Sequence, residues 1–170
     1  MTQGSLFDDR DPSEAEVIQH AGADLVFYPK WLDQTEADYL FRHCQSQLAW
    51  EQSHIVLYGK STLIPRLNAW YGDAGSDYQY SGTRFTPLPF DVELDGLRSR
   101  LQELLQTPFN SVLANLYRDG QDSVSWHSDD EPELGRAPVI ASLSLGAERV
   151  FSLKSKKDKN QSPLHLSLAP

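Results

Sequence analysis

Residues 115–131 read NLYRDGQDSVSWHSDDE, and this stretch decides both the fold and the chemistry that the sequence predicts. We expect a strand over residues 123–127, which places His127 at its end and Asp129 two positions further on. Side chains two apart on a strand point the same way, so this imidazole and this carboxylate can reach one metal ion. A His-x-Asp pair also arises by chance in many sequences, and a solvated loop that carries a histidine and acids is the alternative interpretation.

Two helices are expected outside this stretch. Asp33 and Glu36 have the spacing of a capping box, with Asp standing in for Ser or Thr, and they predict the start of the first helix. Apolar residues follow at helical intervals, and a second helix fits residues 92–106. The first apolar stripe comprises Ala37, Leu40, Phe41, Cys44 and Leu48, and the second comprises Leu94, Leu97, Leu101, Leu104 and Leu105.

The rest of the chain has the sequence pattern of short strands separated by turns. Glycine and proline break up the β-like runs between Trp50 and Phe90, where residues 55–58 look like a strand that runs into a turn at Gly59-Lys60. Later strands are expected over residues 111–117, 123–127, 138–145, 149–154 and 164–169. This pattern predicts an α+β fold in which N-terminal helices pack on a β-sandwich or jelly roll.

Composition fits one globular domain and leaves its partner open. Residues 1–23 are polar and acidic, so we expect a flexible tail before a domain over 24–170. Residues 1–24 carry a net charge of −5, which leaves −4 of the chain's −9 for the remainder and does not exclude nucleic acid. No apolar run approaches the roughly 20 residues of a membrane span. The single cysteine excludes an internal disulfide, and we expect a cytoplasmic monomer.

Four segments, in order, resemble the AlkB family of Fe(II)- and 2-oxoglutarate-dependent dioxygenases. They are residues 65–82 (PRLNAWYGDAGSDYQYSG), 115–120 (NLYRDG), 126–131 (WHSDDE) and 138–147 (PVIASLSLGA), and the resemblance covers roughly residues 25–170. It implies a double-stranded β-helix core and Fe(II) bound by His127 and Asp129. It also implies that Asn115 and Tyr117 hydrogen-bond the co-substrate 2-oxoglutarate. Two histidines and one carboxylate on one face of the metal leave three positions open for O2 and a co-substrate.

The resemblance further implies oxidative dealkylation of N-alkylated bases in DNA or RNA. A flipped base needs aromatic faces for stacking, and a cationic alkylated base favours a nearby carboxylate. Any of these residues could instead have a purely structural role, and a hydroxylase of a protein or small molecule remains the alternative enzyme. The matching substrate-side residues are Tyr58 at a hairpin tip, Arg66, Asn68, Tyr78, Tyr80 and Glu131.

The chain departs from the family pattern after Asp129. Its only later histidine is His165, which lies 38 positions beyond His127 and is followed by no arginine. We therefore expect His165 not to be a ligand and the second metal histidine to be absent from this sequence. A 170-residue form is expected to turn over little 2-oxoglutarate, with a natural C-terminal extension restoring activity. A catalytically inactive nucleic-acid-binding module is the further alternative.

The first residues contain a second short motif. Gln3-Gly-Ser-Leu6-Phe7 resembles the Gln-x-x-Leu-Phe peptides that bind bacterial sliding clamps. A flexible segment can dock two neighbouring apolar side chains in a groove, which gives the match a physical basis. Matches of five residues also occur by chance, and an unstructured terminus is the alternative interpretation.

Overall fold

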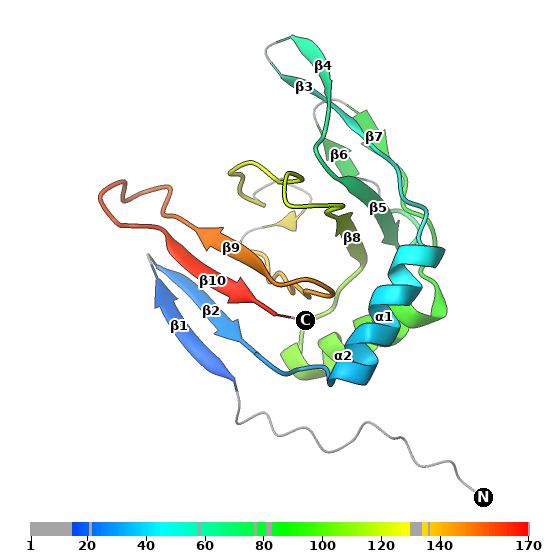
Figure 1. The fold of residues 1–170 in the computed structure, drawn as a ribbon, viewed down its shortest axis with the longest axis horizontal. Helices are drawn as coiled ribbons and strands as arrows, with labels where there is room; N and C mark the ends of the chain where they lie inside the picture. Colours follow the sequence, from blue (N-terminus) through cyan, green and yellow to red (C-terminus); the bar gives the residue numbers. More distant parts are fainter. Residues whose placement is uncertain are drawn as a thin grey trace, which may run out of the picture. The chain divides into compact units, whose positions relative to one another are not determined.

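The computed structural model describes residues 15–20, 22–57, 59–76, 78–80, 83–129, 134–135 and 137–169. The chain divides into two compact units, of which the first comprises Met1–Arg42 and Leu143–Pro170 and the second comprises His43–Ser142. Figure 1 shows the elements in chain order. None of the helices in the described ranges is long and apolar enough to cross a membrane.

The first unit contains two antiparallel hairpins. Strand β1 (Glu16–His20) pairs with β2 (Ala23–Phe27), and β9 (Arg149–Leu153) pairs with β10 (Leu164–Leu168). The expected tail over residues 1–23 is thus wrong for residues 16–20, whose short run of β-formers completes a hairpin with the next strand. Gly22 makes that turn possible, because its φ of 77° lies where glycine is favoured. Residues 1–14 lie outside the described part of the chain.

Helix α1 (Gln34–Gln47) begins where the capping residues predict. The Asp33 carboxylate accepts a hydrogen bond of 2.9 Å from the Glu36 backbone N–H, which satisfies one of the amides that a helix N-terminus leaves unpaired. Ala37 and Leu40 are buried, as the apolar stripe requires. The expected helix and its first residue are confirmed.

The second unit is built around an antiparallel pair of strands. β5 (Leu67–Gly72) pairs with β8 (Ser111–Leu116), so that Ala69 lies opposite Ala114. One face of this pair belongs to the core, which gathers Leu48, Ala69, Tyr71 and Leu94 with Val112 and Ala114 packed against them. The opposite face carries Asn68 and Asn115, because side chains alternate along a strand.

Helix α2 (Val92–Leu105) contributes Leu94 and Leu97 as its buried residues. Asp91 caps it by accepting a 2.8 Å hydrogen bond from the Leu94 N–H, and its second carboxylate oxygen lies 2.8 Å from His43 Nε2. The expected helix over residues 92–106 is confirmed except for Gln106, which takes a left-handed conformation and ends the helix.

Two smaller hairpins complete the second unit. β3 (His54–Leu57) pairs with β4 (Lys60–Leu63), and β6 (Tyr78–Tyr80) pairs with β7 (Thr83–Phe85). The expected turn at Gly59 is confirmed by its φ of 76°. Each sheet within the described ranges has two strands, and the structure thus shows an α+β composition with small antiparallel sheets.

Two expected strands are wrong. Residues 123–127 and 138–145 have no regular secondary structure in the described part of the chain. In the first of these, the Ser123 N–H donates a 2.8 Å hydrogen bond to the Pro65 carbonyl oxygen, and one such bond does not make the ladder of a strand pair. The strands expected over 111–117, 149–154 and 164–169 are confirmed to within one residue.

Candidate active site

His127 and Asp129 converge, as the spacing predicts. The Nε2 atom of His127 lies 3.4 Å from the Oδ1 atom of Asp129, and their side chains are 55% and 45% exposed. The two side chains meet although residues 123–127 do not form the expected strand. An imidazole nitrogen and a carboxylate oxygen at this separation are two suitable donors for a divalent metal ion that the solvent can reach.

A backbone contact orients the His127 ring. Its Nδ1 atom lies 2.9 Å from the Ser125 carbonyl oxygen. A carbonyl oxygen only accepts hydrogen bonds, so Nδ1 carries the proton and donates it. In the neutral ring, Nε2 then presents its lone pair toward Asp129, which is the arrangement that metal-binding histidines use. A cation shared by the two groups would relieve the repulsion between their electron pairs.

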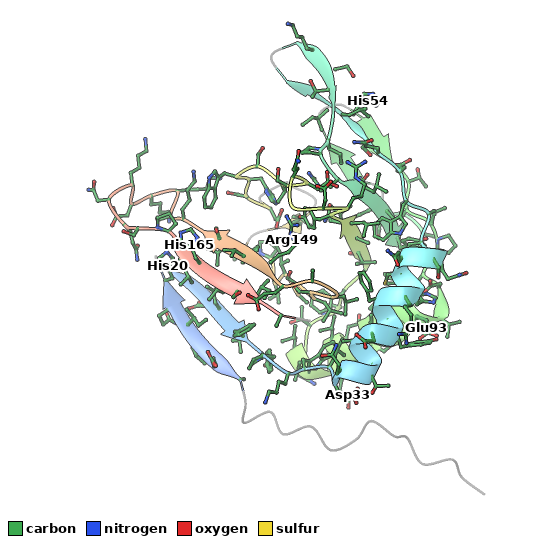
Figure 2. All side chains as sticks on the ribbon, in the orientation of Figure 1. His20, Asp33, His54, Glu93, Arg149 and His165 are labelled. Carbon is green, nitrogen blue, oxygen red and sulfur yellow. The ribbon has the colours of Figure 1, made fainter. Side chains whose placement is uncertain are left out.

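The pair does not form a complete ligand set by itself. Among the residues that the structure describes, no group of three or more His, Cys, Asp or Glu side chains is placed to hold a metal ion. His165 lies on β10, where Figure 2 labels it, and its Nδ1 atom is 2.7 Å from the Ser152 hydroxyl on the paired strand. The donors present therefore fit two positions of a metal site.

An ordered turn joins β8 to the His127 segment. Asp122 is buried and accepts hydrogen bonds from the backbone and guanidinium of Arg118, at 2.9 Å from N, 2.7 Å from Nε and 2.9 Å from Nη2. Hydrogen bonding to Asp122 raises the pKa of Arg118 above its usual range. Asp119 accepts from the backbone N–H groups of Gln121 and Asp122. These contacts fix the path of the chain toward His127.

Asn115 and Asn68 lie together on the β5–β8 pair. They are directly opposite each other in the register, so their side chains are neighbours on one face. Asn115 is exposed, and Tyr117 follows two positions later, half-buried, just past the end of β8. The Asn68 Oδ1 atom accepts a 2.9 Å hydrogen bond from the Ser53 hydroxyl.

Arg66 reaches this pair of asparagines from the residue before β5. Its Nε atom donates to Asn115 Oδ1 at 2.7 Å. The structure thus joins the residue expected near the nucleotide with one expected at the co-substrate. Tyr78 and Tyr80 occupy alternate positions of β6, while Tyr58 and Glu131 lie outside the described residues.

Comparisons with known proteins identify the family of this chain. Residues 24–169 match the family model described as the 2OG-Fe(II) oxygenase superfamily. The chain is 43% identical over 133 residues to human alpha-ketoglutarate-dependent dioxygenase alkB homolog 3, covering 78% of the chain and 46% of the relative. It is 37% identical over 139 residues to mouse DNA oxidative demethylase ALKBH2, covering 80% and 58%. An Arabidopsis thaliana ALKBH2 is 33% identical over 156 residues, covering 89% and 49%.

The chain belongs to the 2OG-Fe(II) oxygenase superfamily and, within it, to the AlkB family. It spans about half the length of the curated relatives that it matches.

Several supporting contacts were missed from the sequence. The pairing of Arg118 with Asp122 and the contacts of Ser53, Ser123 and Ser125 were not predicted. An Asp-Gly pair at residues 119–120 is a turn signal that could have indicated the first of these. The serine contacts carry no comparable signal, because two of them use backbone atoms.

Proposed function

We propose that the protein removes alkyl groups from N-alkylated bases of DNA, or of RNA, with Fe(II), O2 and 2-oxoglutarate. The observation that carries the proposal is the convergence of His127 and Asp129 in a member of this superfamily. The names of its relatives support the substrate class, since one is a dioxygenase and others are DNA oxidative demethylases. We also propose that the protein has the double-stranded β-helix fold.

Four residues are assigned to the iron and to 2-oxoglutarate. His127 and Asp129 would hold the iron, and Asn115 and Tyr117 would hold 2-oxoglutarate by hydrogen bonds. The bound iron supplies the oxidation, in which O2 and 2-oxoglutarate give succinate, CO2 and a hydroxylated alkyl carbon, and the hydroxylated group then leaves as an aldehyde. The solvent-accessible position of the pair suits a substrate as large as an oligonucleotide.

Substrate recognition is assigned to the residues that match the family's substrate side. Tyr78 and Tyr80 would stack on the extruded base, which has a π-face regardless of its identity. Glu131 would favour the positive charge of an N-alkylated adenine or cytosine. Asn68 and Tyr58 complete this set.

The test measures methyl-dependent turnover by the natural gene product. The protein is loaded with Fe(II) under nitrogen and given air, 2-oxoglutarate and an oligonucleotide that contains one 1-methyladenine, with the unmodified oligonucleotide as reference. We expect formaldehyde and restored adenine only from the methylated strand. Asp129→Ala should abolish both, whereas Asp158→Ala, an exposed acid in the loop before β10, should change neither.

Two outcomes would contradict the proposal. Succinate formation that ignores every alkylated oligonucleotide but responds to a protein or small molecule would identify a different hydroxylase. Tight binding of the oligonucleotide without iron binding would identify an inactive nucleic-acid-binding module.

The proposal extends to a bacterial sliding clamp as a partner through Gln3–Phe7. The support is the sequence pattern, in which Leu6 and Phe7 provide adjacent apolar side chains. A purified clamp should retain the wild-type protein on a column and lose it when Leu6 and Phe7 are both changed to Ala. Replacing Asp8 and Asp9 with Ala serves as the control outside the motif. Equal retention of all three proteins would refute this partner.

A further inference from the structure

Arg66 connects two parts of the candidate site. Its Nε atom donates to Asn115 Oδ1 on β8 at 2.7 Å, and its Nη1 atom donates to the Ser123 carbonyl oxygen at 3.4 Å. The Ser123 N–H in turn bonds to the carbonyl oxygen of Pro65, the residue before Arg66, at 2.8 Å. Arg66 thus lies between the strand that carries Asn115 and the segment that leads to His127.

The contact decides how the Asn115 amide is turned. A guanidinium has only donors, so the Asn115 atom that faces it must be the carbonyl oxygen. The NH2 group of Asn115 then points away from Arg66, and the residue is exposed. Two N–H donors in this position suit a ligand that offers only acceptors, such as a carboxylate or a keto acid. Without Arg66, the amide could turn and present its oxygen, which would repel such a ligand.

The other contact limits the movement of Arg66 itself. Because the Ser123 carbonyl accepts from Nη1 while Asn115 accepts from Nε, the guanidinium is held on both sides. A planar group with a rigid set of donors can hold two acceptors at once, which a lysine ammonium does less well. Arg66 was expected near the nucleotide, but two of its donor atoms, Nε and Nη1, are engaged by the protein itself.

We propose that Arg66 is a positioning residue for the co-substrate. It turns the Asn115 amide so that its N–H groups face 2-oxoglutarate, and it ties Asn115 to the segment that carries the metal pair. The inference rests on the proposed function of Asn115 and deepens it. Partners that orient a ligand-binding side chain typically contribute roughly 10–100-fold to affinity or activity in metal sites. We expect about a tenfold effect here, because Asn115 is one of several contacts.

The experiment measures 2-oxoglutarate binding rather than turnover. The natural gene product is loaded with Mn(II), which does not support the reaction, and 2-oxoglutarate is titrated by calorimetry. Arg66→Gln should raise the Kd for 2-oxoglutarate about tenfold, and Arg66→Lys should have a smaller effect because an ammonium can still donate to Asn115. Mn(II) affinity and melting temperature should stay near those of the wild type. Arg100→Gln on α2 makes the same charge change and serves as the control.

A double-mutant cycle separates positioning from general structural support. In an Asn115→Ala background, the amide is gone, so Arg66→Gln should raise the Kd for 2-oxoglutarate no further. Full additivity of the two changes would overturn the inference. So would a parallel loss of Mn(II) affinity and stability in Arg66→Gln.

The outcome also distinguishes this inference from the proposed function. If Arg66→Gln weakens binding of a methylated oligonucleotide and leaves the 2-oxoglutarate Kd unchanged, Arg66 contacts the nucleotide and the inference fails while the function stands. If the wild-type protein does not bind 2-oxoglutarate, the proposed function itself fails, and the inference fails with it.

Discussion

The Nδ1 atom of His127 lies 2.9 Å from the carbonyl oxygen of Ser125. This contact is made within a tripeptide, so the orientation of the ring depends on the local backbone and not on a distant partner. It leaves Nε2 on the side of Asp129, 3.4 Å from Oδ1. The local backbone thus orients two metal-binding atoms, His127 Nε2 and Asp129 Oδ1, toward each other without the help of another ligand.

His127 and Asp129 should both contribute to the binding of a divalent metal ion. His127→Ala and Asp129→Ala should each weaken Mn(II) binding by at least roughly tenfold, since each removes one of the donors that the described residues bring together. The affinity is measured from the electron paramagnetic resonance signal of free Mn(II). His165→Ala should leave the affinity unchanged, as should Asp158→Ala. Full affinity in His127→Ala would show that the metal binds elsewhere.

The turn between β8 and His127 provides a test of stability. Asp122 is buried and satisfied by Arg118, so Asp122→Ala leaves a guanidinium and a backbone N–H without their acceptor. We expect a loss of about 1–3 kcal/mol in the free energy of unfolding, measured by urea denaturation. Asp122→Asn keeps an acceptor for the Arg118 N–H and should lose less. An unchanged free energy in Asp122→Ala would show that the turn is held by other contacts.

The helix positions and the closeness of His127 to Asp129 were predictable from the sequence because their causes are local. The cap at Asp33 and the two-residue spacing of His127 and Asp129 act over a few positions. The strand expected over 123–127 was not found although its residues alternate between polar and apolar, because the Ser123 N–H bonds to Pro65, far away in the chain, and no local pattern encodes that contact. The link from Arg66 to Asn115 spans 49 positions and depends on the register of β5 and β8, which no local pattern encodes.

Cys44 gives a prediction about pH. Burial, with a further effect of the Asp91 charge, raises the pKa of the Cys44 thiol from 9.0 to about 11. The folded-state pKa is above the unfolded value, so the unfolded chain loses its proton first. The contribution of the protonated thiol to the free energy of unfolding is therefore fully present below pH 9 and is lost between about pH 9 and 11. Cys44→Ala should remove this part of the pH dependence, measured as the free energy of unfolding in urea at several pH values.

Thiol reactivity provides the matching readout. In the native protein, a disulfide reagent should react slowly with Cys44 at about pH 8, and it should react fast once the chain is unfolded in urea, because the reactive species is the thiolate. Fast modification of the native protein at that pH would contradict the raised pKa. Trp50 should report the same unfolding, since its indole N–H donates to the Cys44 carbonyl oxygen at 2.9 Å.

Two glycines should respond to alanine with opposite signs. Gly146 has a φ of 82°, and a Cβ there would lie 2.7 Å from the Phe41 ring. Gly146→Ala therefore combines backbone strain with a clash, and we expect a loss of about 1–3 kcal/mol in stability. Gly96 lies inside α2, where an added Cβ would meet no atom within 4 Å outside its own stretch of helix. Gly96→Ala should raise stability by about 0.5–1 kcal/mol, because alanine loses less backbone entropy in a helix.

The pair is measured side by side, since both changes add the same methyl group and alter no charge. Thermal and urea unfolding should rank Gly96→Ala above the wild type and Gly146→Ala below it. Phe41→Leu should recover part of the loss in Gly146→Ala, because the smaller side chain makes room for the methyl group but does not relieve the positive φ. If Gly146→Ala is as stable as the wild type, the close approach of Phe41 to this turn is not present in solution.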